Sequence, residues 1–380
     1  MNIKSIALAG AIGLGCASLA SAATQYVYMT GSTAARNAFY NTIIDGSTVF
    51  DSAPTVIAQG SSDPSKATYH LWHGTIAGQD TIIKAHWSGS EGGISDIAGS
   101  PTETFLDDSA ATSTSSPGPF ISSTVDLAAA DNDKAFSRNP GALITGSKVC
   151  IIPFIWVKEK GSAAGLVNVT DQNVRQALKG YAVLAQFTGN PADTTYVYVS
   201  GRDNQSGTRV NQFGDCGFGI FSSPFMVQIA ANGSMIDQTG FGTYLGDYGY
   251  SSGGTVATQM GYDLSQATSV DVANGSGVEK FSVIGYLGRS DANTAEANGA
   301  TDLTCNGVAY SNAAIKEGQY NLWGNEYVYR RNTSTPQATA VFNKLVASAG
   351  VSGHADGTLT IKLTDMHCIR NGPTSDPVHN

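Results

Sequence analysis

The sequence feature that most constrains the fold is a strand, a turn of small residues and a helix, in that order, which occurs three times. The turns are TGSTA from Thr30, SGSEGG from Ser88 and QSGT from Gln205. Glycine lets the backbone approach a neighbour closely, and Ser and Thr hydroxyls can bond the free amides of a helix start. Strands that alternate with helices predict an α/β protein with largely parallel sheets.

Other segments continue or interrupt this alternation. The apolar residues 148–157 (KVCIIPFIWV) predict a buried strand, and residues 169–184 and 335–349 predict helices. Residues 100–124 do not fit the pattern, and neither do residues 231–278, which are rich in Gly, Ser and Tyr. We interpret these two segments as insertions or long surface loops.

The N-terminus has the composition of a secretory signal peptide. Residues 1–22 contain Lys4, an apolar run and the small residues Ala20-Ser21-Ala22. This pattern predicts cleavage before Ala23 and a periplasmic or extracellular protein without a membrane span. Cys16 follows Gly15 as in a lipoprotein signal, which leaves lipidation open as an alternative.

Length and charge limit the classes of function. Removal of residues 1–22 leaves about 358 residues, for which two domains are the expectation. Removal of Lys4 from the 21 basic residues leaves 20 against 30 acidic residues, a net charge of −10. Such a chain is a poor partner for nucleic acid or anionic membranes. A small anion is not excluded, because a local group of backbone amides can bind one.

The remaining cysteines are even in number and belong to an exported chain. Up to two disulfides are therefore expected among Cys150, Cys216, Cys305 and Cys368. Three pairings are possible, and we favour Cys150–Cys216 with Cys305–Cys368. Three histidines, His70, His73 and His86, lie close in sequence, but no carboxylate or cysteine at a recognisable spacing completes a metal site.

Four motifs together resemble the substrate-binding proteins of phosphate ABC transporters, the PstS-like group. TGSTA and GSEGG are similar to the first and second anion turns of that family, and VDLAAADN (125–132) to its strand that ends in a buried aspartate. RDNQSGT (202–208) resembles the Arg-x-Asp-Gly-Ser-Gly-Thr signature. Weaker similarity comes from VIGYL (283–287) and GQYNLWGNEYVY (318–329), which resemble the segments that return to the first domain.

The resemblance implies a two-lobed, type II periplasmic-binding-protein fold with a ligand cleft between two α/β domains. Domain 1 is expected at residues 24–155 and 288–380, and domain 2 at 156–287. The implied function is binding of phosphate or a related oxyanion for ABC-type uptake, without a cofactor, metal or reaction. The implied partner is a membrane permease with its ATPase. The alternative is an extracellular structural or adhesive protein that keeps the fold without transport.

The resemblance also implies roles for single residues. Arg202 supplies the positive charge, and Asp131 accepts a hydrogen bond from a protonated ligand oxygen. Hydroxyl or amide donors to the anion are expected from the three turns, at Thr33, Ala34, Ser90, Ser206, Gly207 and Thr208.

Several of these residues have alternative interpretations. Asp131 can be a cap of the polar turn DNDK, and Arg202 a surface or interdomain ion-pair partner. Arg209 is expected to be structural. Asn204 stands where the family signature has an aspartate that orients the arginine. Glu91 lies inside the second anion turn, where a carboxylate facing the cleft repels phosphate and one facing solvent does not.

Overall fold

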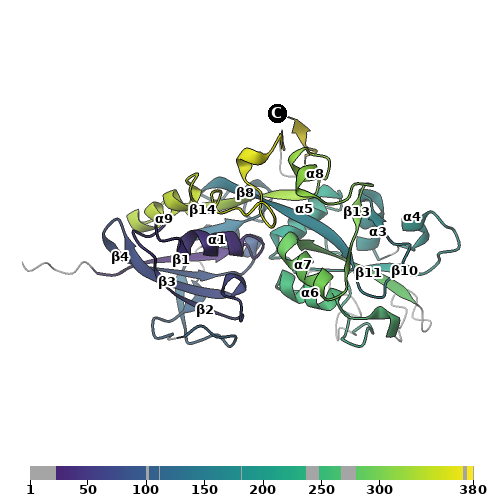
Figure 1. Cartoon of the computed structure of the whole chain (residues 1–380), viewed down its shortest axis with the longest axis horizontal. Coiled ribbons are helices and arrows are strands. Elements are labelled where there is room, and N and C mark those ends of the chain that lie inside the picture. Colours follow the sequence, from purple (N-terminus) through teal and green to yellow (C-terminus); the bar gives the residue numbers. More distant parts are fainter. Residues whose placement is uncertain are drawn as a thin grey trace, which may run out of the picture.

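The structure is a computed structural model that describes residues 23–99, 102–110, 112–180, 182–236, 248–266, 280–370 and 375–379. Two halves lie side by side, and two long strands run between them (Figure 1). These strands are β8 (Ile144–Lys158) and β14 (Trp323–Arg331). The predicted signal peptide and Cys16 lie outside the described residues. The exact limits of the two lobes stay a prediction.

One sheet crosses the whole molecule. Its order is β10-β11-β8-β14-β7-β1-β4-β3-β2, and β12 pairs with β8 beside this path. The first half therefore holds β1 to β4, and the second half holds β10 and β11. The remaining strands of this sheet are β1 (Gln25–Gly31), β2 (Thr55–Gln59), β3 (Tyr69–Ile76), β4 (Gln79–His86), β7 (Leu127–Ala130), β10 (Tyr196–Ser200), β11 (Phe281–Gly288) and β12 (Thr301–Asp302).

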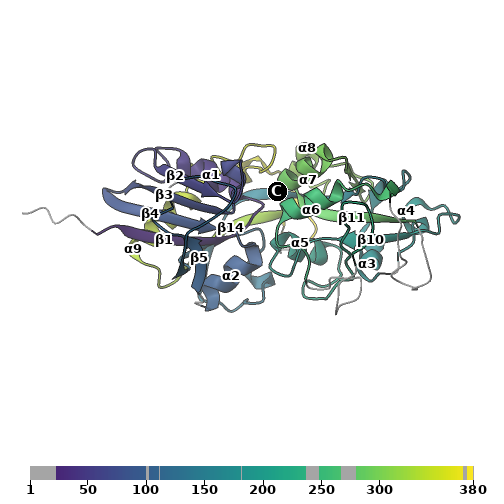
Figure 2. The same cartoon turned by 90° about the horizontal axis from the view of Figure 1, so that it is seen from below.

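Helices lie on both sides of this central sheet (Figure 2). Small sheets of two strands pair β5 (Thr102–Leu106) with β6 (Phe120–Thr124), β9 (Asn168–Val169) with β13 (Thr304–Cys305), and β15 (Cys368–Ile369) with β16 (Val378–His379). The α-helices are α1 (Arg36–Ile44), α2 (Ser90–Gly99), α3 (Asp171–Leu178), α4 (Ala185–Thr188), α5 (Gly207–Asp215), α6 (Gly253–Met260), α7 (Arg289–Ala297), α8 (Asn312–Lys316) and α9 (Pro336–Val346).

The expected α/β class is confirmed, but the expectation of a largely parallel sheet is wrong. Parallel pairs join β1 to β4, β1 to β7 and β10 to β11. Antiparallel pairs join β14 to both β8 and β7, and β11 to β8. The reason is that β8 and β14 cross between the halves in opposite directions, while β2, β3 and β4 form hairpins.

Local sequence explains where the predicted helices begin. The Thr170 side chain accepts from the Asn173 amide, and the Asn173 side chain accepts from the Thr170 amide, so α3 starts with a capping box. The helix ends at Leu178 and not at residue 184, because Gly180 adopts a positive φ of 83°. Pro336 begins α9, where its missing N–H costs no hydrogen bond.

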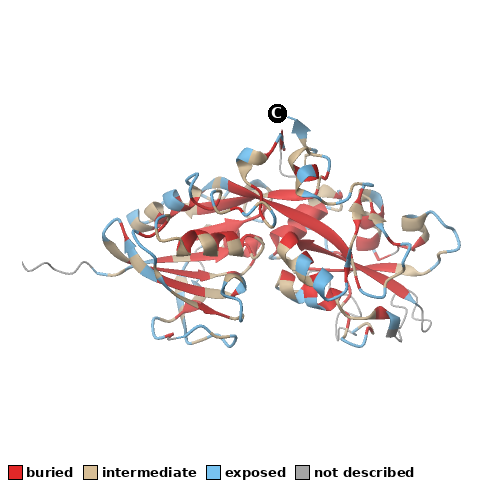
Figure 3. Cartoon of the chain, in the orientation of Figure 1, coloured by how far each residue is buried: buried red, intermediate tan, exposed pale blue. Residues whose placement is uncertain are grey.

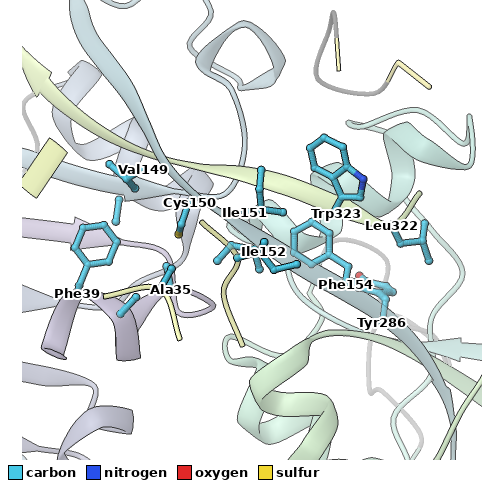
Figure 4. Packing of buried hydrophobic residues seen from close by; sticks show 14 of the residues in the cluster. Ala35, Phe39, Val149, Cys150, Ile151, Ile152, Phe154, Tyr286, Leu322 and Trp323 are labelled. Atoms are coloured by element: carbon cyan, nitrogen blue, oxygen red, sulfur yellow. The ribbon is translucent and has the colours of Figure 1, made fainter. Parts of the chain in front are cut away.

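The core is continuous through the crossing strands. Buried residues follow β8 from one half to the other (Figure 3). Ala35 and Phe39 of the first half and Tyr286 of the second half belong to one hydrophobic cluster with Ile152 and Phe154 of β8 (Figure 4). The two halves are therefore joined by shared packing as well as by covalent crossings.

The two predicted insertions differ from plain loops. Residues 100–124 contain the β5–β6 hairpin, which packs beside β4 and β3. Residues 231–278 contain α6, whose start is capped by Ser252. Within this second segment, residues 237–247 and 267–279 lie outside the described residues.

The C-terminal segment crosses over the long strands. Ile361 exchanges two backbone hydrogen bonds with Ile151 of β8, at 2.9 and 3.0 Å. Further along, Arg370 forms a buried ion pair of 2.7 Å with Asp215 at the end of α5. The segment therefore ties the end of the chain to both the crossing strand and the second half.

The cysteines do not form the expected disulfides. Cys150, Cys216, Cys305 and Cys368 are all buried and free in this structure. Within the residues the structure describes, no helix is long and apolar enough to cross a membrane.

Asp96 of α2 provides a test of the packing of this helix. Its side chain is buried, and burial followed by the charge of Glu103 raises the pKa of Asp96 to about 7. A carboxyl whose folded pKa lies above its unfolded value contributes stability below the unfolded value, and this stability is lost as pH rises through the folded value. Asp96→Asn should therefore match the wild type near pH 4 and exceed its unfolding free energy at pH 8.

The expected gain is about 4 kcal/mol at pH 8, because the pKa of Asp96 rises from 3.8 to about 7 and each pKa unit corresponds to about 1.4 kcal/mol. Urea unfolding of both proteins at the two pH values measures it. The exposed Asp376→Asn variant is the control. An equal difference at both pH values would show that the titration of Asp96 does not set the effect.

Candidate functional site

The three Gly/Ser/Thr turns meet where the two halves touch. They follow the carboxyl ends of β1, β4 and β10 and lead into α1, α2 and α5, respectively. The strands β1 and β4 are neighbours in the first half, while β10 belongs to the second half. Because α2 packs against α5, the turn of the second half lies against the turns of the first. Such strand ends are where open α/β sheets bind ligands.

Gly207 of the second half lies close against the first half. A Cβ atom added at this glycine would lie 1.7 Å from Asp131 Oδ1, 2.6 Å from Ser90 Cβ and 2.8 Å from Asn132 Oδ1. Every other amino acid therefore prevents this approach. The predicted residues Ser90, Asp131 and Gly207 are brought together at the first turn of α5.

Asp131 is buried with an exposure of 2%. Its Oδ2 accepts from Thr208 Oγ1 at 3.2 Å, and its backbone N–H donates to Ser90 Oγ at 3.1 Å. Within the described residues, Asp131 Oδ1 has no hydrogen-bond partner. Burial raises the pKa of Asp131, and the Ser90 hydroxyl and the positive charge of Arg202 oppose this rise.

The alternative interpretation of Asp131 as the cap of the DNDK turn is wrong. Asp133 caps this turn instead, since its Oδ1 accepts from the Ala135 amide at 2.9 Å. The Asp131 carboxylate points away from the turn toward α5, where the hydroxyl of Thr208 reaches it. Asn211 of α5 also donates to the Asp131 carbonyl oxygen at 2.7 Å.

The start of α2 is occupied by the opposite half. The amides of Glu91 and Gly92 both donate to the carbonyl oxygen of Gln205, at 3.0 and 3.3 Å. This backbone oxygen holds the place where an anion was expected at the second turn. Two backbone hydrogen bonds therefore close the contact between the halves.

Glu91 does not face solvent. Its exposure is 1%. Its two oxygens accept from the Arg138 backbone N–H at 2.6 Å and from Asn132 Nδ2 at 3.3 Å. Burial raises the pKa of Glu91, and these two donors lower it. Glu91 thus fixes residues 132–138 beside the Asp131 strand end.

Arg202 is buried and reaches from the second half to the first. Its Nε donates to the Tyr250 carbonyl at 3.0 Å, and its Nη2 to the Ser251 carbonyl at 2.8 Å. Its Nη1 lies 3.4 Å from Thr33 Oγ1 of the first half. The two carbonyls orient the guanidinium, which is the role that the family signature gives to an aspartate at the position of Asn204.

A buried carboxylate, that of Glu326, accepts a hydrogen bond from the turn after β1. Ser32 Oγ donates to Glu326 Oε2 at 3.0 Å, and Glu326 has no exposed surface. Burial, followed by the negative charge of Asp131, raises the pKa of Glu326 well above its ordinary value. Beside this turn, Ala34 lies against Gly288, where an added Cβ would be 3.4 Å from the Ala34 Cβ.

The remaining predicted residues are structural in this arrangement. Ser206 caps α5, since its Oγ accepts from the Arg209 amide at 3.3 Å. Arg209 is buried, donates to the Arg202 carbonyl at 3.3 Å and lies over the Phe213 ring. Arg209 therefore supports the turn that carries Arg202, as expected of a structural residue.

The histidines have other partners. His70 contacts the Trp87 indole and the Pro64 carbonyl, while His73 and His86 pair with Asp80 and Glu103. No group of three or more metal-ligating side chains is found in the described part of the chain. A cavity of about 490 Å³ lies in the second half, lined by residues that include Ser162, Thr195 and Lys280, and none of the three turns lines it.

Sequence reasoning missed the residues that hold these turns in place. Gln205, Tyr250 and Ser251 act through backbone carbonyls, which no sequence pattern reveals. Glu326 lies in a segment that is similar to the family, GQYNLWGNEYVY. A lone glutamate within an apolar strand was the available signal, because a carboxylate is rarely buried without a partner.

Gly207→Ala tests the contact between the halves. The new methyl group would overlap Asp131 and Ser90, so we expect the halves to separate and the radius of gyration to increase in small-angle X-ray scattering. Gly254→Ala in α6 is the matched control, since its Cβ would meet the nearest atoms at 3.9 Å. An unchanged scattering curve for Gly207→Ala would contradict the contact.

Comparison with known proteins supports the fold alone. No known protein-family profile and no curated protein matches the chain. A Clostridium perfringens structure with bound phosphate, assigned as a phosphate ABC transporter substrate-binding protein, matches with a TM-score of 0.53 and 12% identity over 89% of this chain and 100% of that one. A Vibrio cholerae ABC-type phosphate transport receptor matches with a TM-score of 0.47 and 11% identity over 88% and 99%. The match to the Clostridium perfringens structure shows that this chain shares the two-lobed α/β fold of that protein.

Proposed function

We propose that the chain is an exported solute-binding protein that holds phosphate or a related oxyanion between its two lobes. The observation that carries this proposal is Arg202. Its buried guanidinium is oriented by two carbonyls and lies beside Thr33 of the opposite lobe. Arginine presents donors in a planar fork that matches an oxyanion. The neighbour with bound phosphate has the same fold.

Asp131 gives the site a basis for choosing among oxyanions. Its Oδ1 is buried and has no partner in the described part of the chain, so it can accept a hydrogen bond. Phosphate near neutral pH carries a proton to donate, whereas sulfate does not. A bare carboxylate facing sulfate meets repulsion without a compensating bond. The proposed ligand is therefore a protonated tetrahedral oxyanion.

Binding requires the lobes to separate first. In the present arrangement Gly207 touches Asp131, and Gln205 covers the start of α2. An anion can enter among these groups after the two backbone bonds to Gln205 open. Hinge motion about a few crossing segments is the usual means of such opening, and here β8 and β14 are the crossing segments.

The proposal extends to the cellular role. A periplasmic or extracellular binding protein of this fold delivers its ligand to a membrane permease with an ATPase. We propose binding without a reaction. A structural protein that keeps this fold without transport is the other outcome that the following experiments can reveal.

Arg202→Gln should weaken phosphate binding roughly 10- to 100-fold, because hydrogen bonds to a charged group contribute about 1.5 to 3 kcal/mol. The measurement is calorimetric titration of residues 23–380 with inorganic phosphate at low ionic strength, after bound anion is removed by partial unfolding and refolding. Arg330→Gln on β14, whose Nη1 donates to the Arg331 carbonyl, is the matched control.

Two results would contradict this proposal. Equal phosphate affinities of the wild type and Arg202→Gln would remove the proposed charge role. No phosphate binding by a folded wild-type sample would support the structural alternative.

Asp131→Asn should narrow the preference for phosphate over sulfate. The amide can donate to sulfate and no longer repels it, so sulfate affinity should rise while phosphate affinity falls. Titration of both anions at pH 8 gives the ratio. A ratio equal to that of the wild type would exclude Asp131 as the selecting acceptor.

A further inference from the structure

Arg36 is a second arginine at the contact between the lobes, and sequence analysis did not select it. It is the first residue of α1, three positions after Thr33. Within the described residues, its guanidinium makes no hydrogen bond and no ion pair within 4.0 Å. Its side chain is half-buried. A half-buried arginine without such partners is unusual, because its five donors need acceptors.

Charged residues of the second lobe affect the pKa of Arg36, and one of them, Arg202, is also positive. Burial lowers the pKa of Arg36, and the positive charge of Arg202 lowers it further, while Asp291 opposes both. The helices α1 and α7 lie on opposite sides of the junction in both views (Figure 1, Figure 2). Thr33 lies three residues before Arg36, and its Oγ1 is 3.4 Å from Arg202 Nη1, so the two arginines flank the turn after β1 from opposite lobes.

Asp291 is the counter-charge on the second lobe. It lies in the first turn of α7 and against the start of α6, where a Cβ added at Gly253 would be 2.0 Å from Asp291 Oδ2. Burial raises the pKa of Asp291, and Arg36 and Arg202 are the first two charges that lower it. Asp291 thus carries a negative charge on the second lobe that the charges of both arginines favour.

The start of α1 also differs from the starts of α2 and α5. Gln205 satisfies the first amides of α2, and Ser206 caps α5. At α1 the N-cap residue is Ala35, and no side chain caps the helix. This uncapped start favours negative charge, and Thr33, which precedes it, has its Oγ1 3.4 Å from Arg202 Nη1.

We propose that Arg36 is a second cationic contact for the oxyanion, so that Arg36 and Arg202 hold the ligand from opposite lobes while Asp291 competes with it. This inference rests on the proposed function. Two arginines would balance two negative charges on the ligand, and Asp131 would accept a hydrogen bond from a proton that the ligand still carries. The ligand that fits both requirements is a doubly negative anion with one proton. Hydrogen phosphate and its arsenate analogue are anions of this class.

The main alternative is that Arg36 and Asp291 only attract each other and hold the lobes together. The two roles predict different directions for the change in ligand affinity when Arg36 and Asp291 are replaced. If the pair is a latch, Arg36→Gln and Asp291→Asn both remove the same attraction and change ligand affinity in the same direction. If Arg36 contacts the ligand and Asp291 repels it, the two substitutions change affinity in opposite directions.

The experiment is calorimetric titration with inorganic phosphate at pH 8 of the wild type, Arg36→Gln and Asp291→Asn. We expect affinity to fall about tenfold in Arg36→Gln and to rise several-fold in Asp291→Asn, as a change of one nearby charge predicts. Lys179→Gln, on the exposed end of α3, removes the same charge far from the junction and should leave affinity unchanged.

The outcomes separate this inference from the function on which it rests. Shifts of the same sign in both variants would overturn the role of Arg36 as a ligand contact, and so would an unchanged affinity in Arg36→Gln. In both cases phosphate binding that depends on Arg202 would still support the proposed function. Absence of phosphate binding by the folded wild type would overturn both.

Discussion

The contact of Gly207 with Asp131 is the constraint on which the junction of the lobes depends. It brings the start of α5 against the end of β7, where no side chain larger than hydrogen fits. Once this approach is made, the Gln205 carbonyl reaches the start of α2, and Thr208 reaches the Asp131 carboxylate. A carboxylate and a carbonyl oxygen thus hold positions that suit an anion, because the same backbone donors and helix dipoles attract all three.

Much of the fold could be predicted because the signals are local. A capped start such as Thr170 and the strand that leads to Asp131 are each encoded within a few residues. The direction of β8 and β14 could not be predicted in this way. Strand direction depends on where the chain returns to the sheet, and an apolar run such as residues 148–157 has the same pattern in either direction.

The site shows the same division between local and distant information. Sequence motifs brought Ser90, Asp131 and Gly207 to attention, and the structure places these three in contact. The partners of Arg202 could not be predicted, because they are carbonyls of residues about 50 positions away in sequence. The direction of the Glu91 side chain likewise depends on the loop of residues 132–138, which has no motif of its own.

Positive side chains gather at the junction of the lobes, although the chain as a whole is negatively charged. The whole sequence has a formal net charge of −9, yet Arg36, Arg202 and Arg209 gather near the point where the lobes meet. The carboxylates there are buried, and burial raises the pKa of Asp131 and of Glu326. Burial disfavours the negative charge of these carboxyl groups, whereas an arginine keeps its positive charge in nearly every environment. A chain that repels anions over its surface can therefore attract one at this junction, since short-range donors outweigh a distant field that salt screens within about 10 Å.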